Sequence, residues 1–312
     1  MNSQVFCCPA CKSRQINSLE SVPTSEIAKF WSVTSLESGE QLKKYLDSGK
    51  APSTVDMAKC CDCGLEFATP MFAAGEEWYT EEIYTMRWEF NKTLEDLKPG
   101  SEILEIGCGE GVFLDLAVRE GHSALGVDFN LGAIQLAKAK GLEVYCWNLK
   151  ELSERLPSRK FDAVMFFHVI EHIEDLETFF QELSQIMPTG SSIHFSCPSS
   201  NRWTTQFETD RKVGLREVWD YPPYHQTRWN PVATDKILSR FGWKLQKSLE
   251  EPFDWRGMST YIVSKELAAK GLELSVLSPV ERKIKIATKM VKTFMPSIKC
   301  SGMSMYYQAI RQ

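Results

Sequence analysis

The hydrophobic positions of this chain follow two different periods, and the alternation between them predicts most of its elements. Between residues 102 and 198, short apolar runs alternate with amphipathic segments of helical period. Apolar runs separated by helices are typical of a doubly wound α/β sheet that is covered on both faces. The predicted strands are 102–107, 123–129, 142–147, 161–169 and 192–198, and the predicted helices are 112–120, 131–140 and 176–187.

The second half of the chain adds two predicted insertions. Residues 201–230 are dense in Trp, Tyr, Arg and Pro without a clear period, and we expect a loop over the sheet. A helix (233–242), a strand (243–249) and a last strand (302–311) follow, separated by an insertion at 255–300. That insertion contains the amphipathic, Lys-rich stretch "ERKIKIATKMVKTF", which could contact a membrane surface or a partner. A solvated helix packed on the domain is the favoured interpretation.

Composition and charge exclude some classes of protein. The 312 residues are 43% hydrophobic and 25% charged, as in ordinary globular proteins. The net charge of -5 provides no general attraction for nucleic acid, so a nucleic-acid partner is not expected. The first residues lack the apolar core of a secretory signal, and no apolar run has the length of a membrane span. We therefore expect a cytoplasmic location.

Six of the ten cysteines lie within the first 63 residues. Four of them form two C-x-x-C motifs, which are Cys8 with Cys11 and Cys60 with Cys63. Two such motifs can supply four thiolates to a structural zinc ion. The gap between the motifs is longer than in most zinc ribbons, and Cys7 and Cys61 are alternative ligands. We expect a zinc-ribbon-like module at 1–74 and a second domain at 75–312.

A glycine-rich turn follows the first predicted strand of the second domain. Gly107, Gly109 and Gly111 are spaced G-x-G-x-G, and Asp128 ends the next strand, about 20 residues later, where a carboxylate suits the hydroxyls of a ribose. The spacing differs from that of dinucleotide-binding turns, and Glu105 would repel a pyrophosphate there. A cofactor with a cationic amino-acid end and no phosphate fits better. S-adenosylmethionine (SAM) is such a cofactor.

The stretches "LEIGCGEGVFLDLA" and "GVDFN" resemble the first two cofactor motifs of class I SAM-dependent methyltransferases. The resemblance implies a seven-stranded, Rossmann-like sheet whose last strand is antiparallel. It also implies that Glu105 and the turn 107–111 line the methionine end of SAM and that Asp128 holds the ribose. Phe129 could then pack on the adenine. Asn148 stands where this family usually has an aspartate near the adenine amino group.

The predicted strand 161–169 ends in "HVIEH", beside the place where the methyl group would lie. His168, Glu171 and His172 can be interpreted in three ways. They can shape the pocket, with His168 lining the cofactor, or His168 or His172 can act as a general base. They can also belong to a divalent metal site, because ubiquinone-biosynthesis O-methyltransferases show Glu-x-x-Glu-His here. His168 replaces the first glutamate of that pattern.

The loop "DYPPYHQTRWNP" resembles the "PPHH-x-x-RW" loop of bacterial methyltransferases of sugar and glycan synthesis. His225 matches the second histidine and is the preferred base. The expected substrate-binding residues are the aromatic and cationic side chains around it, Tyr221, Tyr224, Arg228 and Trp229. The stretch "AKCCDCGLEFATP" also resembles the N-terminal module of these enzymes.

The sequence therefore predicts a SAM-dependent methyltransferase with an N-terminal zinc ribbon. The favoured acceptor is a hydroxyl group of a nucleotide sugar or glycan intermediate. One alternative is O-methylation of a phenol or another small metabolite. The other is a zinc-ribbon protein that binds nucleic acid, such as an RNA methylase, which the acidic net charge disfavours.

Overall fold

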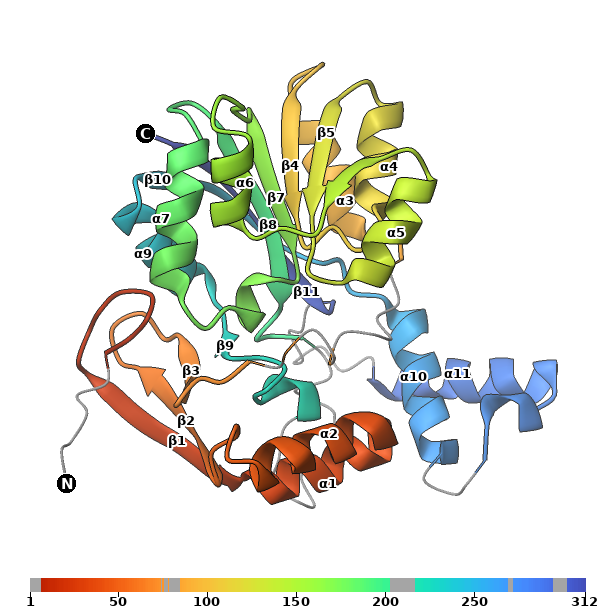
Figure 1. Cartoon of the computed structure of the whole chain (residues 1–312). Coiled ribbons are helices and arrows are strands. Elements are labelled where there is room, and N and C mark those ends of the chain that lie inside the picture. Colours follow the sequence, from red (N-terminus) through yellow and green to blue (C-terminus); the bar gives the residue numbers. More distant parts are fainter. Residues whose placement is uncertain are drawn as a thin grey trace, which may run out of the picture.

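The computed structural model describes residues 7–73, 75, 78, 85–202, 217–268, 272–293 and 302–312. Figure 1 shows a large sheet flanked by helices above a smaller N-terminal unit, with a pair of helices projecting to one side.

The large sheet has seven strands. Their order is β10 (Trp243–Glu250), β11 (Ser304–Arg311), β8 (Ser192–Pro198), β7 (Ala163–Phe167), β4 (Glu102–Ile106), β5 (Ser123–Val127) and β6 (Glu143–Tyr145). The pairs from β8 to β6 are parallel, whereas β11 runs antiparallel to both β8 and β10. The predicted α/β sheet with an antiparallel last strand is confirmed, and each predicted strand has its counterpart.

Helices cover both faces of this sheet. One face is packed by α3 (Trp88–Asp96), α4 (Val112–Arg119) and α5 (Leu131–Ala139), and the other by α6 (Leu149–Arg155), α7 (Leu176–Ile186) and α9 (Pro231–Arg240). Phe113, Leu114 and Ala117 of α4 are buried because the apolar residues of its helical period face the sheet. Helix α6 was not predicted from periodicity. It begins at a capping box formed by Asn148 and Glu151.

The N-terminal unit contains a second sheet, and one strand of this sheet comes from a segment far away in the sequence. It contains β1 (Ile16–Pro23), α1 (Thr24–Thr34), α2 (Leu36–Asp47), β2 (Thr54–Cys60) and β3 (Glu66–Thr69). The sheet order is β1-β2-β3-β9, and β9 (Thr227–Arg228) comes from the segment expected to lie as a loop over the large sheet. Pairing with β9 satisfies backbone groups that the edge of β3 would otherwise leave open. The strand 227–228 of that segment therefore completes the N-terminal sheet.

The two units share one hydrophobic core. Cys8, Cys60 and Cys63 pack in the same cluster as Phe180 of α7 and Ile237 of α9. Polar contacts close the rim, where Arg240 Nη1 donates to the carbonyls of Pro9 (3.1 Å) and Ala10 (2.8 Å). Lys12 Nζ also pairs with Glu177 at 2.7 Å. The cysteine motifs are thus attached directly to the helices of the large sheet.

The insertion at 255–300 forms α10 (Trp255–Ala268), a short 3-10 turn (Leu274–Val276) and α11 (Pro279–Thr293). Helix α11 extends away from the body (Figure 1). The favoured expectation was a packed helix, but the side chains of 279–288 are exposed apart from the half-buried Arg282 and Ile286. Among the described helices, none is both long and apolar enough to cross a bilayer.

Candidate functional site

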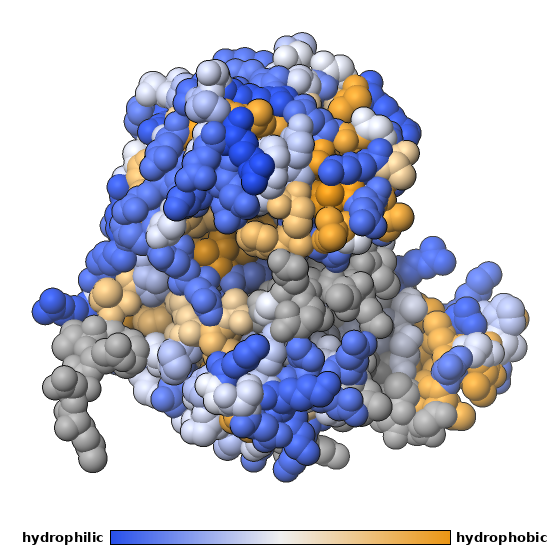
Figure 2. Space-filling model, in the orientation of Figure 1, coloured by the Kyte–Doolittle hydropathy of each residue, from blue (hydrophilic) through white to orange (hydrophobic). Residues whose placement is uncertain are grey.

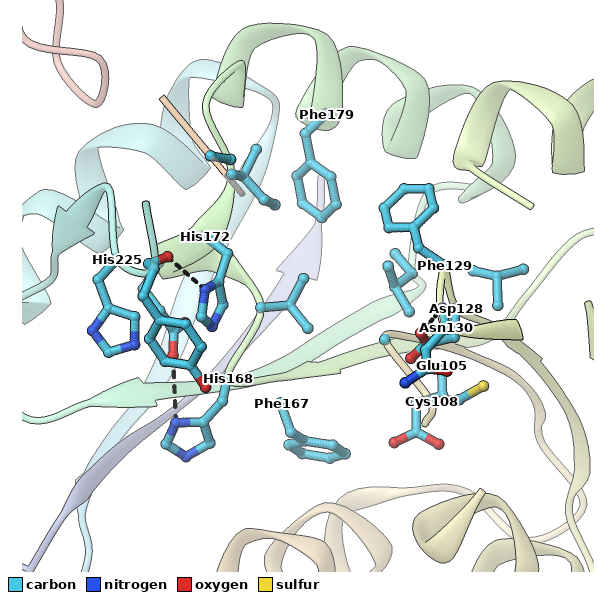
Figure 3. Close-up of a pocket in the computed structure, with 18 of the residues that line it drawn as sticks. Glu105, Cys108, Asp128, Phe129, Asn130, Phe167, His168, His172, Phe179 and His225 are labelled. Carbon is cyan, nitrogen blue, oxygen red and sulfur yellow. Dashed lines mark hydrogen bonds and ion pairs between the residues drawn. The ribbon is translucent and has the colours of Figure 1, made fainter. Parts of the chain in front are cut away.

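A cavity of about 910 Å³ lies at the carboxyl ends of β4, β5 and β7, where α/β sheets bind ligands. This volume is near the upper limit for small-molecule sites and has room for a cofactor beside a second molecule. Figure 3 shows two separate groups of polar side chains in it. We call the group with Glu105, Asp128, Phe129 and Asn130 the turn end. The group with His168, Glu171, His172 and His225 is the histidine end.

Two glycines of the turn end are required by backbone geometry. Gly107 has a φ of 72°, and a Cβ atom there would lie 2.6 Å from Val169 Cγ2. Gly111 has a φ of 74°, precedes helix α4, and would meet Leu142 Cδ1 at 2.4 Å. Gly107 lines the cavity, whereas Gly109 and Gly111 do not. Gly109 instead donates its backbone N–H to Asp128 Oδ2 at 2.7 Å, which fixes the carboxylate to the turn.

The turn end is electronegative. Glu105 is 3% exposed, and its Oε2 atom has no hydrogen-bond partner among the described residues. Burial and the charge of Asp128 raise the pKa of Glu105 well above its usual value, against the opposing charge of Arg87. Burial also raises the pKa of Asp128, although backbone N–H groups donate to it. A cationic group would relieve both carboxyl groups, and SAM carries two such groups, its ammonium and its sulfonium.

The aromatic side of the turn end is partly open. Phe129 lines the cavity and is 60% exposed, and Trp147 and Asn148 lie beside it. The Asn148 Oδ1 atom accepts the Glu151 N–H at 2.8 Å, as the cap of α6. The side chain of Asn148 therefore has a structural contact besides the adenine contact predicted for it.

At the histidine end, His168 lies between two carboxylates. Its Nε2 atom is 3.3 Å from Glu89 Oε1 and its Nδ1 atom is 3.4 Å from Glu171 Oε1. Desolvation lowers the pKa of His168, but Glu171 and Glu89 outweigh this effect and leave the pKa above its usual value. His168 also has a φ of 55°, an uncommon conformation that strained functional sites often contain. A protonated His168 is a poor proton acceptor.

The pKa of His172, in contrast, is lowered. Its Nδ1 atom lies 2.7 Å from the carbonyl oxygen of Tyr224, which can only accept, so Nδ1 carries the proton and Nε2 the lone pair. Desolvation lowers the pKa of His172 to about 4, although the charge of Glu171 opposes the shift. His225 Nδ1 lies 3.6 Å from Asp220 Oδ1. The Nε2 atom of His225 is not part of this ion pair. His172 is therefore neutral near pH 7 and carries a lone pair on Nε2, but its lowered pKa makes it a weaker proton acceptor than an ordinary histidine.

Glu171, His172 and His225 each offer one ligand atom within 4.8 Å of the other two. Burial would raise the pKa of Glu171, but the close contact and charge of His168, together with the two other imidazoles nearby, lower it to about 2. Among the described residues, neither of its oxygens has a hydrogen-bond partner, and Oε1 lies 3.4 Å from His168 Nδ1. An ionised carboxylate and two imidazoles at this spacing could also hold a divalent cation.

Three of the four predicted substrate-binding residues lie away from the cavity. Tyr221 and Trp229 are each 1% exposed, and Arg228 is 8% exposed. Tyr221 donates its hydroxyl to Glu20, and Arg228 contacts Glu66 and the carbonyl of Asp220. They point into the N-terminal unit because β9 pairs with β3. Of the four, Tyr224 lines the cavity.

Two buried residues, one that lines the cavity and one that supports it, had no signal in the sequence. Trp31 of α1 lines the cavity, is 7% exposed, and its indole N–H has no hydrogen-bond partner among the described residues. Gln226 is fully buried and joins distant segments. Its backbone N–H donates to the Glu171 carbonyl at 2.7 Å, and its side chain bonds both backbone groups of Phe72. Contacts that link such distant positions leave no local pattern.

The four cysteines of the two motifs converge. Cys8 Sγ lies 3.5 Å from Cys63 Sγ, and Cys11 Sγ lies 3.5 Å from Cys60 Sγ. All four sulfur atoms lie within 4.8 Å of one another, whereas Cys7 and Cys61 are exposed and outside the cluster. Tetrahedral zinc with Zn–S bonds of about 2.3 Å places its sulfurs at comparable separations. The donor set fits a zinc ion.

Relatives agree with this architecture. The model of the methyltransferase domain family matches residues 79–248. A probable S-adenosylmethionine-dependent methyltransferase from Mycolicibacterium smegmatis is 29% identical over 152 residues, which are 48% of this chain and 54% of that protein. The human mitochondrial ubiquinone biosynthesis O-methyltransferase is 34% identical over 116 residues, 33% of this chain and 31% of its own length. These matches span about half or less of each of the two relatives.

A SAM-dependent methyltransferase from Archaeoglobus fulgidus has a similar solved structure. It covers 76% of this chain and 95% of its own, at 21% identity and a TM-score of 0.47. Because this score is low, the assignment depends on the family match, which covers more than half of the chain. The chain belongs to the methyltransferase domain family.

Proposed function

We propose that this protein is a SAM-dependent O-methyltransferase whose acceptor is the hydroxyl group of an aromatic small molecule. The cofactor proposal depends above all on Glu105, a buried carboxyl group beside Asp128 whose Oε2 atom has no hydrogen-bond partner in the described ranges. When bound, SAM supplies its methyl group as a sulfonium electrophile. The turn 107–111 would hold the methionine end, Asp128 the ribose, and Phe129 and Asn148 the adenine.

The acceptor proposal depends on the other side of the cavity. Trp31, Phe179, Trp219 and Tyr224 give it aromatic walls. Such walls suit an aromatic ring. The indole N–H of Trp31, which has no partner within the described part of the chain, can donate to an oxygen substituent. Two of the relatives are named as ubiquinone biosynthesis O-methyltransferases, which supports a small-metabolite acceptor. The glycan hypothesis depended on a family resemblance and on the loop 221–229. Of that loop, Tyr224 and His225 line this cavity, whereas Tyr221, Arg228 and Trp229 do not.

In the proposed mechanism His172 is the base. Its Nε2 atom carries the lone pair because Nδ1 donates to the Tyr224 carbonyl. It would take the proton of the acceptor hydroxyl, so that the oxygen can attack the methyl group in line. His225 would orient the same hydroxyl, and Glu171 would stabilise the imidazolium that forms. A divalent cation held by Glu171, His172 and His225 would instead favour the ionised hydroxyl directly.

We also propose that Cys8, Cys11, Cys60 and Cys63 hold one structural zinc ion. Their convergence and their place in the shared core support this role. The zinc-binding unit would then comprise most of the predicted module 1–74 together with β9. Measuring the metal content of the purified protein tests the proposal, and a zinc content well below one ion per chain would contradict it.

The proposed activity can be tested in two steps. Calorimetric titration with S-adenosylhomocysteine should show micromolar affinity, and Asp128→Ala should abolish it. Transfer of labelled methyl from SAM should then occur to catechols and not to nucleotide sugars. Transfer to a nucleotide sugar alone would restore the glycan hypothesis. Loss of transfer after EDTA treatment, with recovery on adding Mg²⁺, would favour the cation over the His172 base.

A further inference from the structure

The projecting helices leave an apolar stripe uncovered. Val280 and Ile284 lie one turn apart on α11, Val276 ends the preceding 3-10 turn, and Leu272 precedes that turn. These four residues, which we call the stripe, are 65%, 59%, 61% and 41% exposed, respectively. Helix α11 packs mainly on α10, and Figure 2 shows apolar side chains gathered on this projecting part. Large apolar side chains that are exposed together, rather than singly, mark an interaction surface.

The same helix is basic in an acidic protein. Residues 281–285 contain three cationic side chains, Arg282, Lys283 and Lys285, and one anionic side chain, Glu281. The whole chain, in contrast, has a net charge of -5. Arg282 is half-buried, and the two lysines are exposed. An amphipathic helix with cations beside an apolar stripe is suited to the headgroup region of an anionic bilayer. The apolar side chains enter the acyl boundary, and the lysines reach the phosphates.

A second copy of this chain fits the stripe less well. A symmetric pairing would bring the same surface of both copies together, including their basic side chains. The repulsion between those cations would oppose association, whereas anionic lipid neutralises them.

We propose that the stripe Leu272, Val276, Val280 and Ile284, together with Lys283 and Lys285, docks the protein on an anionic lipid surface. Docking is peripheral, because none of the described helices could span a bilayer. The proposal goes beyond methyl transfer and depends on neither the cofactor nor the acceptor.

Vesicle flotation of the full-length protein tests this surface. The vesicles contain either phosphatidylcholine alone or equal parts of phosphatidylcholine and phosphatidylglycerol. We expect flotation with the second kind only, and weaker flotation as salt rises. Val280→Asp combined with Ile284→Asp should reduce the bound fraction by at least about tenfold. Lys283→Glu with Lys285→Glu should weaken binding by at least roughly fivefold for each lysine.

Leu136→Asp on α5 is the matched control, because Leu136 is an apolar helix residue that is 52% exposed. It should float like the wild type, and all variants should bind S-adenosylhomocysteine as the wild type does. Absence of wild-type flotation would overturn the proposal, as would flotation that survives the Asp pair. Light scattering that shows a dimer, converted to a monomer by the Asp pair, would also overturn it in favour of a second copy.

Discussion

The two ends of the cavity are built from very different lengths of chain. The turn end uses residues within 105–148, one continuous stretch that runs from the end of β4 through α4, β5, α5 and β6. The histidine end combines Trp31, Glu89, the segment 168–172 and the loop 220–225. The first is therefore fixed by local backbone geometry, whereas the second exists only while the N-terminal unit and the large sheet are docked. Substitutions at the turn end should therefore change cofactor affinity, and those at the histidine end should change turnover or the acceptor KM.

The largest effect should come from the histidine end. His172→Ala removes the proposed proton acceptor and should lower kcat by roughly 10²–10⁴-fold. Affinity for S-adenosylhomocysteine should stay within about twofold, because His172 lies outside the turn end. Steady-state kinetics and calorimetry on the same preparation check both statements. An unchanged kcat would transfer the role of base to His225 or remove it altogether.

A glycine substitution should break the turn end instead. Gly107→Ala adds a Cβ atom 2.6 Å from Val169 Cγ2 at a positive φ, and we expect the affinity for S-adenosylhomocysteine to fall about 100-fold. Gly121→Ala is the matched control, because Gly121 has a φ of 87° but no atom within 4 Å of the added Cβ. It should lose stability without losing affinity. Equal losses of affinity for S-adenosylhomocysteine in both variants would show that the close approach to Val169 is not the cause.

Arg228→Lys tests whether the loop residues bind substrate or hold the scaffold. Arg228 donates to the Asp220 carbonyl through Nε (3.2 Å) and Nη2 (2.9 Å) and pairs with Glu66, a geometry that lysine cannot reproduce. We expect the free energy of unfolding to fall by about 1–3 kcal/mol. Acceptor KM and kcat should change little at temperatures where the variant is folded. Arg119→Lys, at an exposed helical ion pair, should be nearly neutral in denaturant unfolding.

The smallest effect should come from Trp31→Phe, which keeps an aromatic wall and removes the indole N–H. The acceptor KM should rise by about threefold to tenfold, as expected for one lost hydrogen bond, whereas the KM for SAM should not change. Lys29→Ala, two residues earlier in α1 and exposed, is the control. A rise in both KM values would mean that α1 supports the whole cavity rather than the acceptor end.

The sequence by itself determined the large sheet and the turn end. Apolar strands such as Ala163–Phe167 are buried on both faces, so their composition alone predicts them. Gly107 is recognisable in the sequence because its positive φ favours glycine, and Asp128 because its carboxylate accepts a backbone N–H of the turn. Such local requirements restrict which residues fit at these positions. The C-x-x-C spacing likewise predicted which four cysteines converge.

The sequence indicated the four residues of the histidine end, but only the tertiary structure decided which other side chains surround them. The loop 221–229 has a composition that suits a sugar site, yet β9 pairs with β3 and turns Tyr221, Arg228 and Trp229 into the protein. Trp31 and Glu89 reach the cavity through packing with partners far away in the chain. Local propensity contains no information on such contacts, because their free energy is gained only when distant segments exclude water together.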